Sequence, residues 1–194
     1  MARIGIDIDD TITDTSAVIK QYVEKYAHEY KDGHILLERE ANIIRGFFDH
    51  EVIVQFFLDH GKEIVGSARL RKHAKDVIDQ LKKEGHEIIF ITARSDQYYT
   101  NATKFCEDYL NEKNVVYDKV ITGQTFKVKT CKEEKIDLMI DDGVDTCCDL
   151  NKAGIKAFLY TTPINMKRNV VSPRIKSGRE AYQKIHNYID ELEK

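Results

Sequence analysis

Five short apolar segments divide the chain into pieces of strand length. They are RIGID (3–7), EIIFIT (87–92), DKVIT (118–122), DLMID (137–141) and KAFLY (156–160). Most of them are too short for helices and are rich in Ile, Val and Phe. Continuous apolar runs of this kind are typical of strands that are covered on both faces. They predict a parallel sheet buried between layers of helices.

Helical patterns lie between these segments. Apolar residues recur at helix spacing from Leu70 to Leu81, where Gly85 follows as a stop signal, and again over 98–109 and 185–192. Strands that alternate with helices form right-handed βαβ units. The predicted fold class is therefore α/β, with a Rossmann-like, doubly wound parallel sheet. The segment 161–178 contains both prolines and predicts a loop before the last helix.

The interval between the first two predicted strands breaks this alternation. A structureless loop of that length is implausible, and residues 15–70 contain helical patterns of their own. We expect these residues to form a small helical cap, inserted after the first strand of a catalytic core made of 1–14 and 71–194. Four aromatic residues of the insert are open to two interpretations, as core of the cap or as a surface that stacks on a base. They are Phe47, Phe48, Phe56 and Phe57.

Composition narrows the choice of partners. Of the 194 residues 32% are charged, and the net charge of −3 gives no field suited to a nucleic-acid polymer or an acidic membrane. No apolar run is long enough to span a membrane, and the N-terminus lacks the layout of a signal peptide. We expect a cytoplasmic chain whose cysteines are small, buried, unpaired residues. The cysteines are Cys106, Cys131, Cys147 and Cys148.

Polar residues stand where four of the predicted strands end. In an open parallel sheet, ligands bind at this carboxyl edge. A run of carboxylates directly after an apolar strand needs a positive partner, because burying an unpaired charge is costly. The residues are Asp7 and Asp9 after the first strand, Thr92 after the second, Lys127 and Lys129 after the third, and Asp141 and Asp142 after the fourth.

This set of groups suits phosphoryl transfer. Clustered carboxylates hold a hard cation such as Mg²⁺, which prefers oxygen ligands. One carboxylate can attack phosphorus and form an aspartyl phosphate. A lysine offsets the negative charge, and a hydroxyl and backbone N–H groups hold the phosphate oxygens.

The same residues resemble the motifs of the haloacid dehalogenase superfamily of phosphatases. Four motifs occur in the order of that superfamily and together cover about residues 3–160. They are DIDDT (7–11), which fits DxDxT, FIT ending in Thr92, the lysine at 127 or 129, and IDD with Asp141 and Asp142.

The resemblance implies a role for each residue. Asp7 would be the nucleophile and a Mg²⁺ ligand, and Asp9 would be the general acid and then the base, with its backbone carbonyl on the metal. Asp142 would bind Mg²⁺ directly, and Asp141 directly or through water. The residues expected to bind the substrate phosphate are Asp10, Thr92, Ala93, Arg94 and Lys127.

Some assignments have alternatives. Lys127 is favoured over Lys129 because it stands at the predicted start of a helix, where the superfamily places this lysine. Arg94 is open to two interpretations, as a phosphate contact or as the ion-pair partner of a neighbouring carboxylate. Asp14 and Asp145 would act as helix caps if they have no part in the site.

Within the superfamily the chain is most similar to the 5′(3′)-deoxyribonucleotidases of the cytosolic type C group and their bacterial relatives. The shared features are a small chain, a helical cap after the first motif, TAR (92–94) and IDLMIDD (136–142). Members of that group often have Gly where Asp10 stands. The resemblance implies a Mg²⁺-dependent 5′-nucleotidase, acting on a deoxyribonucleotide through an aspartyl phosphate.

Other functions fit the sequence less well. The core motifs read only the phosphoryl group, so another small ester such as a sugar phosphate or phosphoserine is the alternative substrate. A signalling receiver domain would carry its phospho-acceptor on a middle strand, where this chain has Thr, and has no place for the insert. A dehalogenase does not need the acid and base that Asp9 supplies. We expect a small phosphate ester as partner and leave a homodimer open.

Overall fold

The structure is a computed structural model that describes residues 1–30 and 50–192. Its centre is a six-stranded, all-parallel sheet with the order β3-β2-β1-β4-β5-β6. The α/β class and all five predicted strands are confirmed. The strands are β1 (Arg3–Ile6), β2 (Glu87–Ile91), β3 (Lys119–Ile121), β4 (Leu138–Asp141), β5 (Lys156–Tyr160) and β6 (Arg174–Ile175).

β6 lies in the segment that was predicted to be a loop, so the prediction is wrong there. The strand has two residues, Arg174 and Ile175, which pair with Leu159 and Tyr160 of β5. Two residues carry no recognisable periodicity. Pairing with β5 and the complete burial of Ile175 create this strand, and both depend on the tertiary fold.

The helices follow the predicted order with shifted ends. α4 begins at Ala74, because Leu70 forms an antiparallel bridge with Thr13. Gly85 follows the helix with a φ of +86°, as its role as a stop requires. The helices are α1 (Thr15–Tyr26), a 3₁₀ turn η1 (Ala27–Glu29), α3 (His50–Ser67), α4 (Ala74–Lys83), α5 (Ala102–Glu112), α6 (Lys127–Glu133), α7 (Val144–Lys152) and α8 (Gly178–Leu192).

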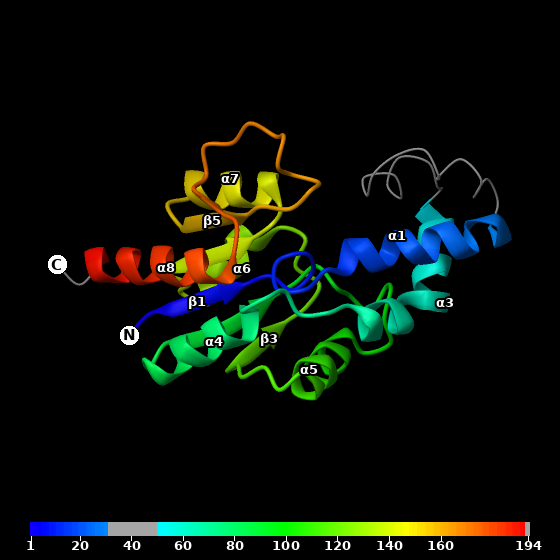
Figure 1. Ribbon diagram of the computed structural model, residues 1–194, viewed down its shortest axis with the longest axis horizontal. Helices are drawn as coiled ribbons and strands as arrows, with labels where there is room; N and C mark the ends of the chain where they lie inside the picture. Colours follow the sequence, from blue (N-terminus) through cyan, green and yellow to red (C-terminus); the bar gives the residue numbers. More distant parts are fainter. Residues whose placement is uncertain (31–49, 193–194) are drawn as a thin grey trace.

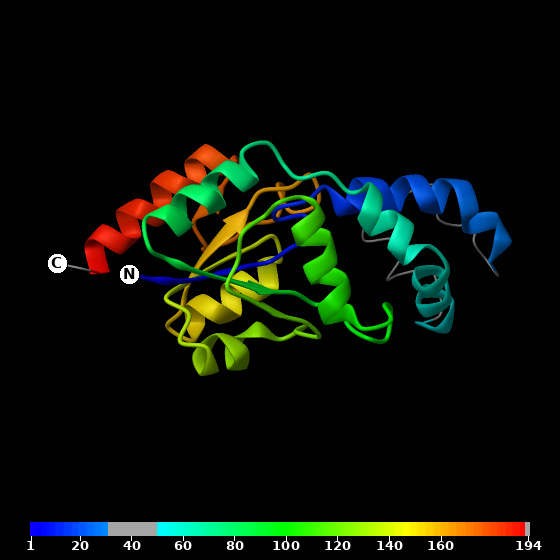
Figure 2. The same ribbon diagram turned by 90° about the horizontal axis from the view of Figure 1, so that it is seen from below.

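Alternate residues of the strands build two cores, one on each face of the sheet. On one face Ile4, Phe90 and Ile140 pack against α4, α5 and α8. On the other face Ile91, Met139 and Leu159 pack against α6 and α7. Figure 2 shows α4 and α8 on one side of the sheet and α6 and α7 on the other. Both faces are therefore covered, which explains the continuous apolar runs of the strands.

The strand register sets the spacing of the residues that follow the strands. Ile6 at the end of β1 pairs with Phe90 of β2 and with Ile140 of β4. Asp7, one residue further on, donates its backbone N–H to the carbonyl oxygen of Ile140 at 2.9 Å. The carboxylates of Asp7 and Asp141 thus extend from adjacent strands at the same edge of the sheet.

α1 and α3 lie together beyond the carboxyl ends of the strands (Figure 1). They bury a small core of their own, which contains Val18 and Ile64 and has Phe56 among its fully buried side chains. Phe57 is half-buried between Phe56 and Tyr98, in edge contact with each ring at centroid distances of 5.6 Å. Phe56 therefore fills the core between the helices. Phe47 and Phe48 lie outside the described residues.

The chain passes between the sheet and these helices at two adjacent points. Thr13 and Leu70 form the antiparallel bridge. Beside it, the Asp14 N–H donates to the Arg69 carbonyl at 3.1 Å, and the Arg69 N–H donates to the Asp14 carboxylate at 2.7 Å. Asp14 therefore joins the two crossing segments with both its backbone and its side chain.

Two sequence expectations concern the whole chain. In the part that the structure describes, no helix combines the length and the apolar character needed to span a membrane. All four cysteines are free thiols. Three of them are buried and Cys148 is half-buried.

Replacing Phe56 tests the importance of the core between α1 and α3. We expect Phe56→Ala to lower the free energy of unfolding by about 3–5 kcal/mol, since it removes a buried ring and leaves a cavity. Leu58→Ala on the same helix is the matched control, because Leu58 is 51% exposed, and it should change stability by less than about 0.5 kcal/mol. Urea denaturation measures both values, and equal losses would contradict the packing described.

Candidate active site

Lys127 joins two carboxylates at the carboxyl edge of the sheet. Its Nζ atom donates to Asp7 Oδ1 at 2.5 Å and to Asp141 Oδ2 at 2.7 Å. Lys127 is the first residue of α6 and is only 5% exposed. Lys129 is exposed and pairs with Glu133 on the same helix at 3.7 Å. The structure thus brings Lys127, and not Lys129, to the predicted carboxylates.

Burial and charge oppose each other at Asp7. Burial raises the pKa of Asp7, Lys127 lowers it, and the charges of Asp141 and Asp9 raise it again, so the pKa of Asp7 comes to about 7. Burial disfavours the charged form of Lys127, but Asp7 and Asp141 outweigh it and raise the Lys127 pKa. Lys127 therefore stays charged between the two carboxylates.

Asp142 brings negative charge that no cation of the described residues neutralises by direct contact. No hydrogen bond or ion pair from residues 1–30 or 50–192 reaches its carboxylate. Its pKa is raised by burial first, and then by the charges of Asp7, Asp141 and Asp10. Asp141 differs, because its Oδ1 accepts the Gly143 N–H at 2.7 Å while its Oδ2 accepts from Lys127.

The carboxylate groups at this edge of the sheet are suitable ligands for a hard divalent cation. Their donor atoms are oxygens, and the excess of negative charge at Asp7 and Asp142 would be relieved by Mg²⁺. Within the described ranges, no three side chains of the His, Cys, Asp or Glu type are arranged as a metal site. The predicted ligands are the side chains of Asp7, Asp141 and Asp142 and the backbone carbonyl of Asp9. Asp141 already accepts one hydrogen bond on each oxygen, whereas the Asp142 carboxylate accepts none from the described residues.

Asp9 is held by Arg94. The Nε atom of Arg94 donates to Asp9 Oδ2 at 2.8 Å, and Nη2 donates to Oδ1 at 2.7 Å. Burial opposes the charge on Asp9, but the guanidinium and its hydrogen bonds outweigh this effect and lower the Asp9 pKa. Of the two interpretations open for Arg94, the structure shows the ion pair with a neighbouring carboxylate.

Thr92 follows β2 and is 1% exposed. Its N–H donates to the Ile121 carbonyl at 3.0 Å, and its own carbonyl accepts the Gln124 N–H at 2.9 Å. The hydroxyl accepts the Arg94 N–H at 3.3 Å, and Ala93 between them is exposed. Backbone hydrogen bonds on both sides thus fix the turn that carries Thr92, Ala93 and Arg94.

Asp10 has a φ of +59°, in the left-handed region where glycine is favoured and Asp is among the tolerated residues. Its carboxylate accepts the Ser16 N–H at 3.0 Å and the Ser16 hydroxyl at the start of α1. Arg71 donates to the Asp10 carbonyl at 3.0 Å. The Asp10 side chain therefore organises the chain leading into α1, which leaves its backbone N–H as the group that can serve a phosphate.

Two residues near the site had no predicted role. The Thr11 hydroxyl lies 3.5 Å from Asp7 Oδ2, as a long hydrogen bond. Asn165, buried in the loop after β5, donates to the Asp142 carbonyl at 2.9 Å and to the Tyr160 carbonyl at 2.7 Å. Thr11 is the last position of DxDxT and could have been assigned a role from its place in that motif. No sequence pattern marks Asn165.

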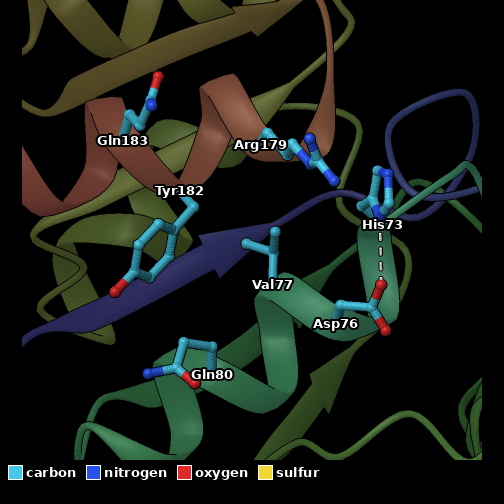
Figure 3. Close-up of a pocket in the computed structure, with 7 residues that line it drawn as sticks. All are labelled: His73, Asp76, Val77, Gln80, Arg179, Tyr182 and Gln183. Atoms are coloured by element: carbon cyan, nitrogen blue, oxygen red, sulfur yellow. Dashed lines mark hydrogen bonds and ion pairs between the residues drawn. The ribbon is translucent and has the colours of Figure 1, made fainter.

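Two peripheral features lie apart from these contacts. Asp145, in the first turn of α7, is exposed and pairs with Arg168 at 3.3 Å. A groove of about 320 Å³ lies between α4 and α8, and Figure 3 shows the side chains that line it. None of the predicted site residues lines it. Its lining residues are His73, Asp76, Val77, Gln80, Arg179, Tyr182 and Gln183.

Comparison with known proteins found relatives over most of the chain. No family model matches the chain. A nucleotidase from Clostridium acetobutylicum is 30% identical over 85% of this chain and 83% of its own length. The Bacillus subtilis protein YqfW, provisionally named a nucleotidase, is 29% identical over 96% of this chain and 95% of its own.

Solved structures with low sequence identity share the fold. A predicted phosphatase from Clostridium acetobutylicum has a TM-score of 0.71 at 16% identity, over 96% of this chain and 98% of that one. A haloacid dehalogenase-like hydrolase from Streptococcus pneumoniae has a TM-score of 0.66 at 13% identity, over 97% and 98%. A β-phosphoglucomutase from Clostridium difficile has a TM-score of 0.64 at 15% identity, over 99% of each chain.

Two lysines of one helix provide a matched test of the buried cation. We expect Lys127→Met to lower the free energy of unfolding by about 3–5 kcal/mol, because it leaves Asp7 and Asp141 buried without their cation. Lys129→Met should change it by less than about 0.5 kcal/mol, since Lys129 is exposed. Denaturant titrations without divalent metal compare the two variants, and a similar effect of both would contradict the arrangement.

Proposed function

The chain belongs to the haloacid dehalogenase superfamily and is a relative of bacterial nucleotidases, and from this we propose that it is a Mg²⁺-dependent nucleotidase. Its substrate would be a nucleoside monophosphate, with a deoxyribonucleotide preferred. The observation that carries the proposal is the pairing of Lys127 with Asp7 and Asp141 at the carboxyl edge of the sheet. The choice of ester is supported by relatives that are named nucleotidases and that match most of the chain.

Asp7 acts first, as the nucleophile. A carboxylate oxygen of Asp7 attacks phosphorus, and the bond between phosphorus and the leaving oxygen breaks. That oxygen keeps the bonding electron pair and takes a proton from the carboxyl group of Asp9. The products of this step are the free nucleoside and a phosphoryl group bound to Asp7.

Water completes the reaction. Asp9, now ionised, takes a proton from a water molecule whose oxygen attacks phosphorus. The bond between phosphorus and Asp7 breaks, Asp7 regains its carboxylate and inorganic phosphate leaves. The lowered pKa of Asp9 favours the ionised form that this second step requires, and it opposes the protonated form that the first step requires.

Four groups are suited to hold the phosphoryl oxygens. They are the Thr92 hydroxyl, the backbone N–H groups of Ala93 and Asp10, and the ammonium of Lys127. Asp10 follows β1, Thr92 and Ala93 follow β2, and Lys127 starts the helix after β3, so these groups are placed before substrate binds. Arg94, whose guanidinium is already bonded to Asp9, is not among them.

The Mg²⁺ ligands would be the Asp7 and Asp142 carboxylates and the Asp9 carbonyl, with Asp141 contributing through water. When bound, Mg²⁺ reduces the repulsion between the anionic ester and the carboxylate that attacks it. Asn165 would support this arrangement, because its hydrogen bond to the Asp142 carbonyl restrains the chain beside the ligand.

Residues 15–70 would form the cap, which excludes water and selects the leaving group. α1 and α3 stand beyond the strand ends that carry Asp7 and Asp141, and they have a separate core. The core motifs contact only the phosphoryl group. For this reason another small ester such as a sugar phosphate remains the second candidate, and a phosphoglucomutase shares the fold.

Replacing Asp7 tests the nucleophile. We expect Asp7→Asn to reduce phosphate release by at least about a thousandfold, because the neutral amide has nearly the same shape and does not attack phosphorus. Asp145→Asn is the control and should keep activity, since Asp145 is exposed and pairs with Arg168 on the surface. Full activity of Asp7→Asn would overturn the assignment.

A substrate panel tests the choice of ester. Phosphate release should be fastest, by at least about tenfold in kcat/KM, with deoxyribonucleoside monophosphates. The panel also contains ribonucleotides, sugar phosphates, phosphoserine and 4-nitrophenyl phosphate. Preference for a sugar phosphate would retain the chemistry and replace the nucleotide by the second candidate.

Metal removal tests the cation site. Activity should be lost in EDTA and return with Mg²⁺. Asp142→Asn should need at least about tenfold more Mg²⁺ for half-maximal activity, because a neutral amide replaces a charged ligand. Asp149→Asn, at an exposed position of α7, should leave the Mg²⁺ requirement unchanged, and full activity of the wild type in EDTA would refute the site.

A further inference from the structure

Arg94 is an arginine buried in the protein and 3% exposed. It donates two hydrogen bonds to Asp9, from Nε to Oδ2 at 2.8 Å and from Nη2 to Oδ1 at 2.7 Å. This bidentate pairing fixes the direction of a carboxylate as well as its position. It is directed at the residue to which the proposed mechanism gives both proton transfers.

The surroundings of Arg94 hold it still. Its guanidinium lies 5.6 Å from the centre of the Tyr109 ring, and Nη1 lies 3.9 Å from the Cys106 sulfur. The Arg94 carbonyl accepts the Gly123 N–H at 2.6 Å. The arginine is therefore fixed at its backbone and along its side chain, and it is suited to aim another group.

The residues packed around Arg94 also contact α3 and the residue that follows it. The Tyr109 hydroxyl donates to the Ala68 carbonyl at 2.9 Å. Tyr99 lies against Gly61, where an added Cβ would come within 2.9 Å of the Tyr99 ring. The guanidinium is thus packed where the inserted helices meet the sheet, and not on a free surface.

We propose that Arg94 is a positioning residue that aims Asp9 at the leaving oxygen and keeps it away from Lys127. This inference rests on the proposed function. Lys127 attracts the Asp9 charge, and its ammonium is already shared by Asp7 and Asp141. Without the guanidinium, the hydrogen bond from the Thr15 side chain would be left to hold Asp9, and we expect the carboxylate to turn toward that ammonium and away from the ester.

The pairing leaves Asp9 able to act. Each carboxylate oxygen has two lone pairs, and Arg94 uses one direction on each oxygen. The Asp9 side chain is 34% exposed, so its other side is open to a ligand. Each nitrogen of the Arg94 guanidinium already has a partner, because Nε and Nη2 donate to Asp9 and Nη1 lies 3.9 Å from the Cys106 sulfur, which makes Arg94 a poor phosphate ligand in this arrangement.

This role predicts a dependence on the leaving group. An alkoxide leaves only with a proton, whereas 4-nitrophenolate leaves without one. We expect Arg94→Met to lower kcat/KM about a hundredfold for a deoxyribonucleoside 5′-monophosphate, the size of a general-acid contribution. For 4-nitrophenyl phosphate the loss should be less than about threefold, because that ester needs little proton donation. kcat/KM is the suitable constant, because it reports the steps up to departure of the leaving group.

Further variants identify Asp9 as the intermediary. Asp9→Asn should show the same selective loss, and Arg94→Met should cost it nothing more on the nucleotide, since the two act as a unit. Arg94→Lys should recover part of the nucleotide activity, and it also serves if Arg94→Met does not fold. Arg168→Gln is the control, because Arg168 forms an exposed pair with Asp145, and it should match the wild type on both esters.

Equal losses on both esters would overturn the inference. If inhibition by inorganic phosphate weakens in parallel, Arg94 binds the phosphoryl group. If the melting temperature falls and inhibition does not change, its role is structural. Failure of the proposed function looks different, because the wild type would then release no phosphate from any ester or Asp7→Asn would retain activity.

Discussion

The ammonium of Lys127, held between Asp7 and Asp141, is the interaction on which the arrangement at the sheet edge depends. Adjacent parallel strands bring the two carboxylates together, and burial makes their mutual repulsion expensive. β3 lies next to β2 in the sheet, and α6 is the helix that follows β3 in the chain. The lysine at the start of α6 thereby reaches the two carboxylates at the ends of β1 and β4. The topology of the sheet therefore determines which charged side chains meet at its carboxyl edge.

Charge at this edge is divided between separate partners. Lys127 forms ion pairs with Asp7 and Asp141, and Arg94 forms one with Asp9. No cationic side chain of the described residues forms an ion pair with Asp142. These four carboxylates therefore differ in their cations, although Asp7 and Asp141 share one. Such differences allow chemically identical groups to attack, exchange protons or bind a cation.

The sequence predicted the elements whose signals are local. The apolar runs located five strands, and the carboxylates after them predicted the edge to which Asp7 and Asp141 belong. The position of Lys127 before a helical pattern separated it correctly from Lys129 as the lysine that meets them. Burial of Phe56 favours the interpretation of that residue as core.

Residues that depend on tertiary contacts were harder to predict. β6 exists because β5 offers a free edge, and Asn165 matters for the site through its hydrogen bond to the Asp142 carbonyl, 23 positions away in the sequence. For Arg94 the sequence left two partners open, because the choice depends on a side chain 85 positions away. The left-handed backbone of Asp10 explains why glycine suits that position, but its bond to Ser16 is visible only in three dimensions.

The antiparallel bridge between Thr13 and Leu70 bears on how such chains diversify. Residues paired in this way have Cα atoms only about 5 Å apart, a gap that a tight turn can close. The positions of β1 and α4 therefore do not depend on how many residues lie between Thr13 and Leu70. It follows that the length of the segment between Thr13 and Leu70 can change without altering the spacing of the carboxylates at the strand ends.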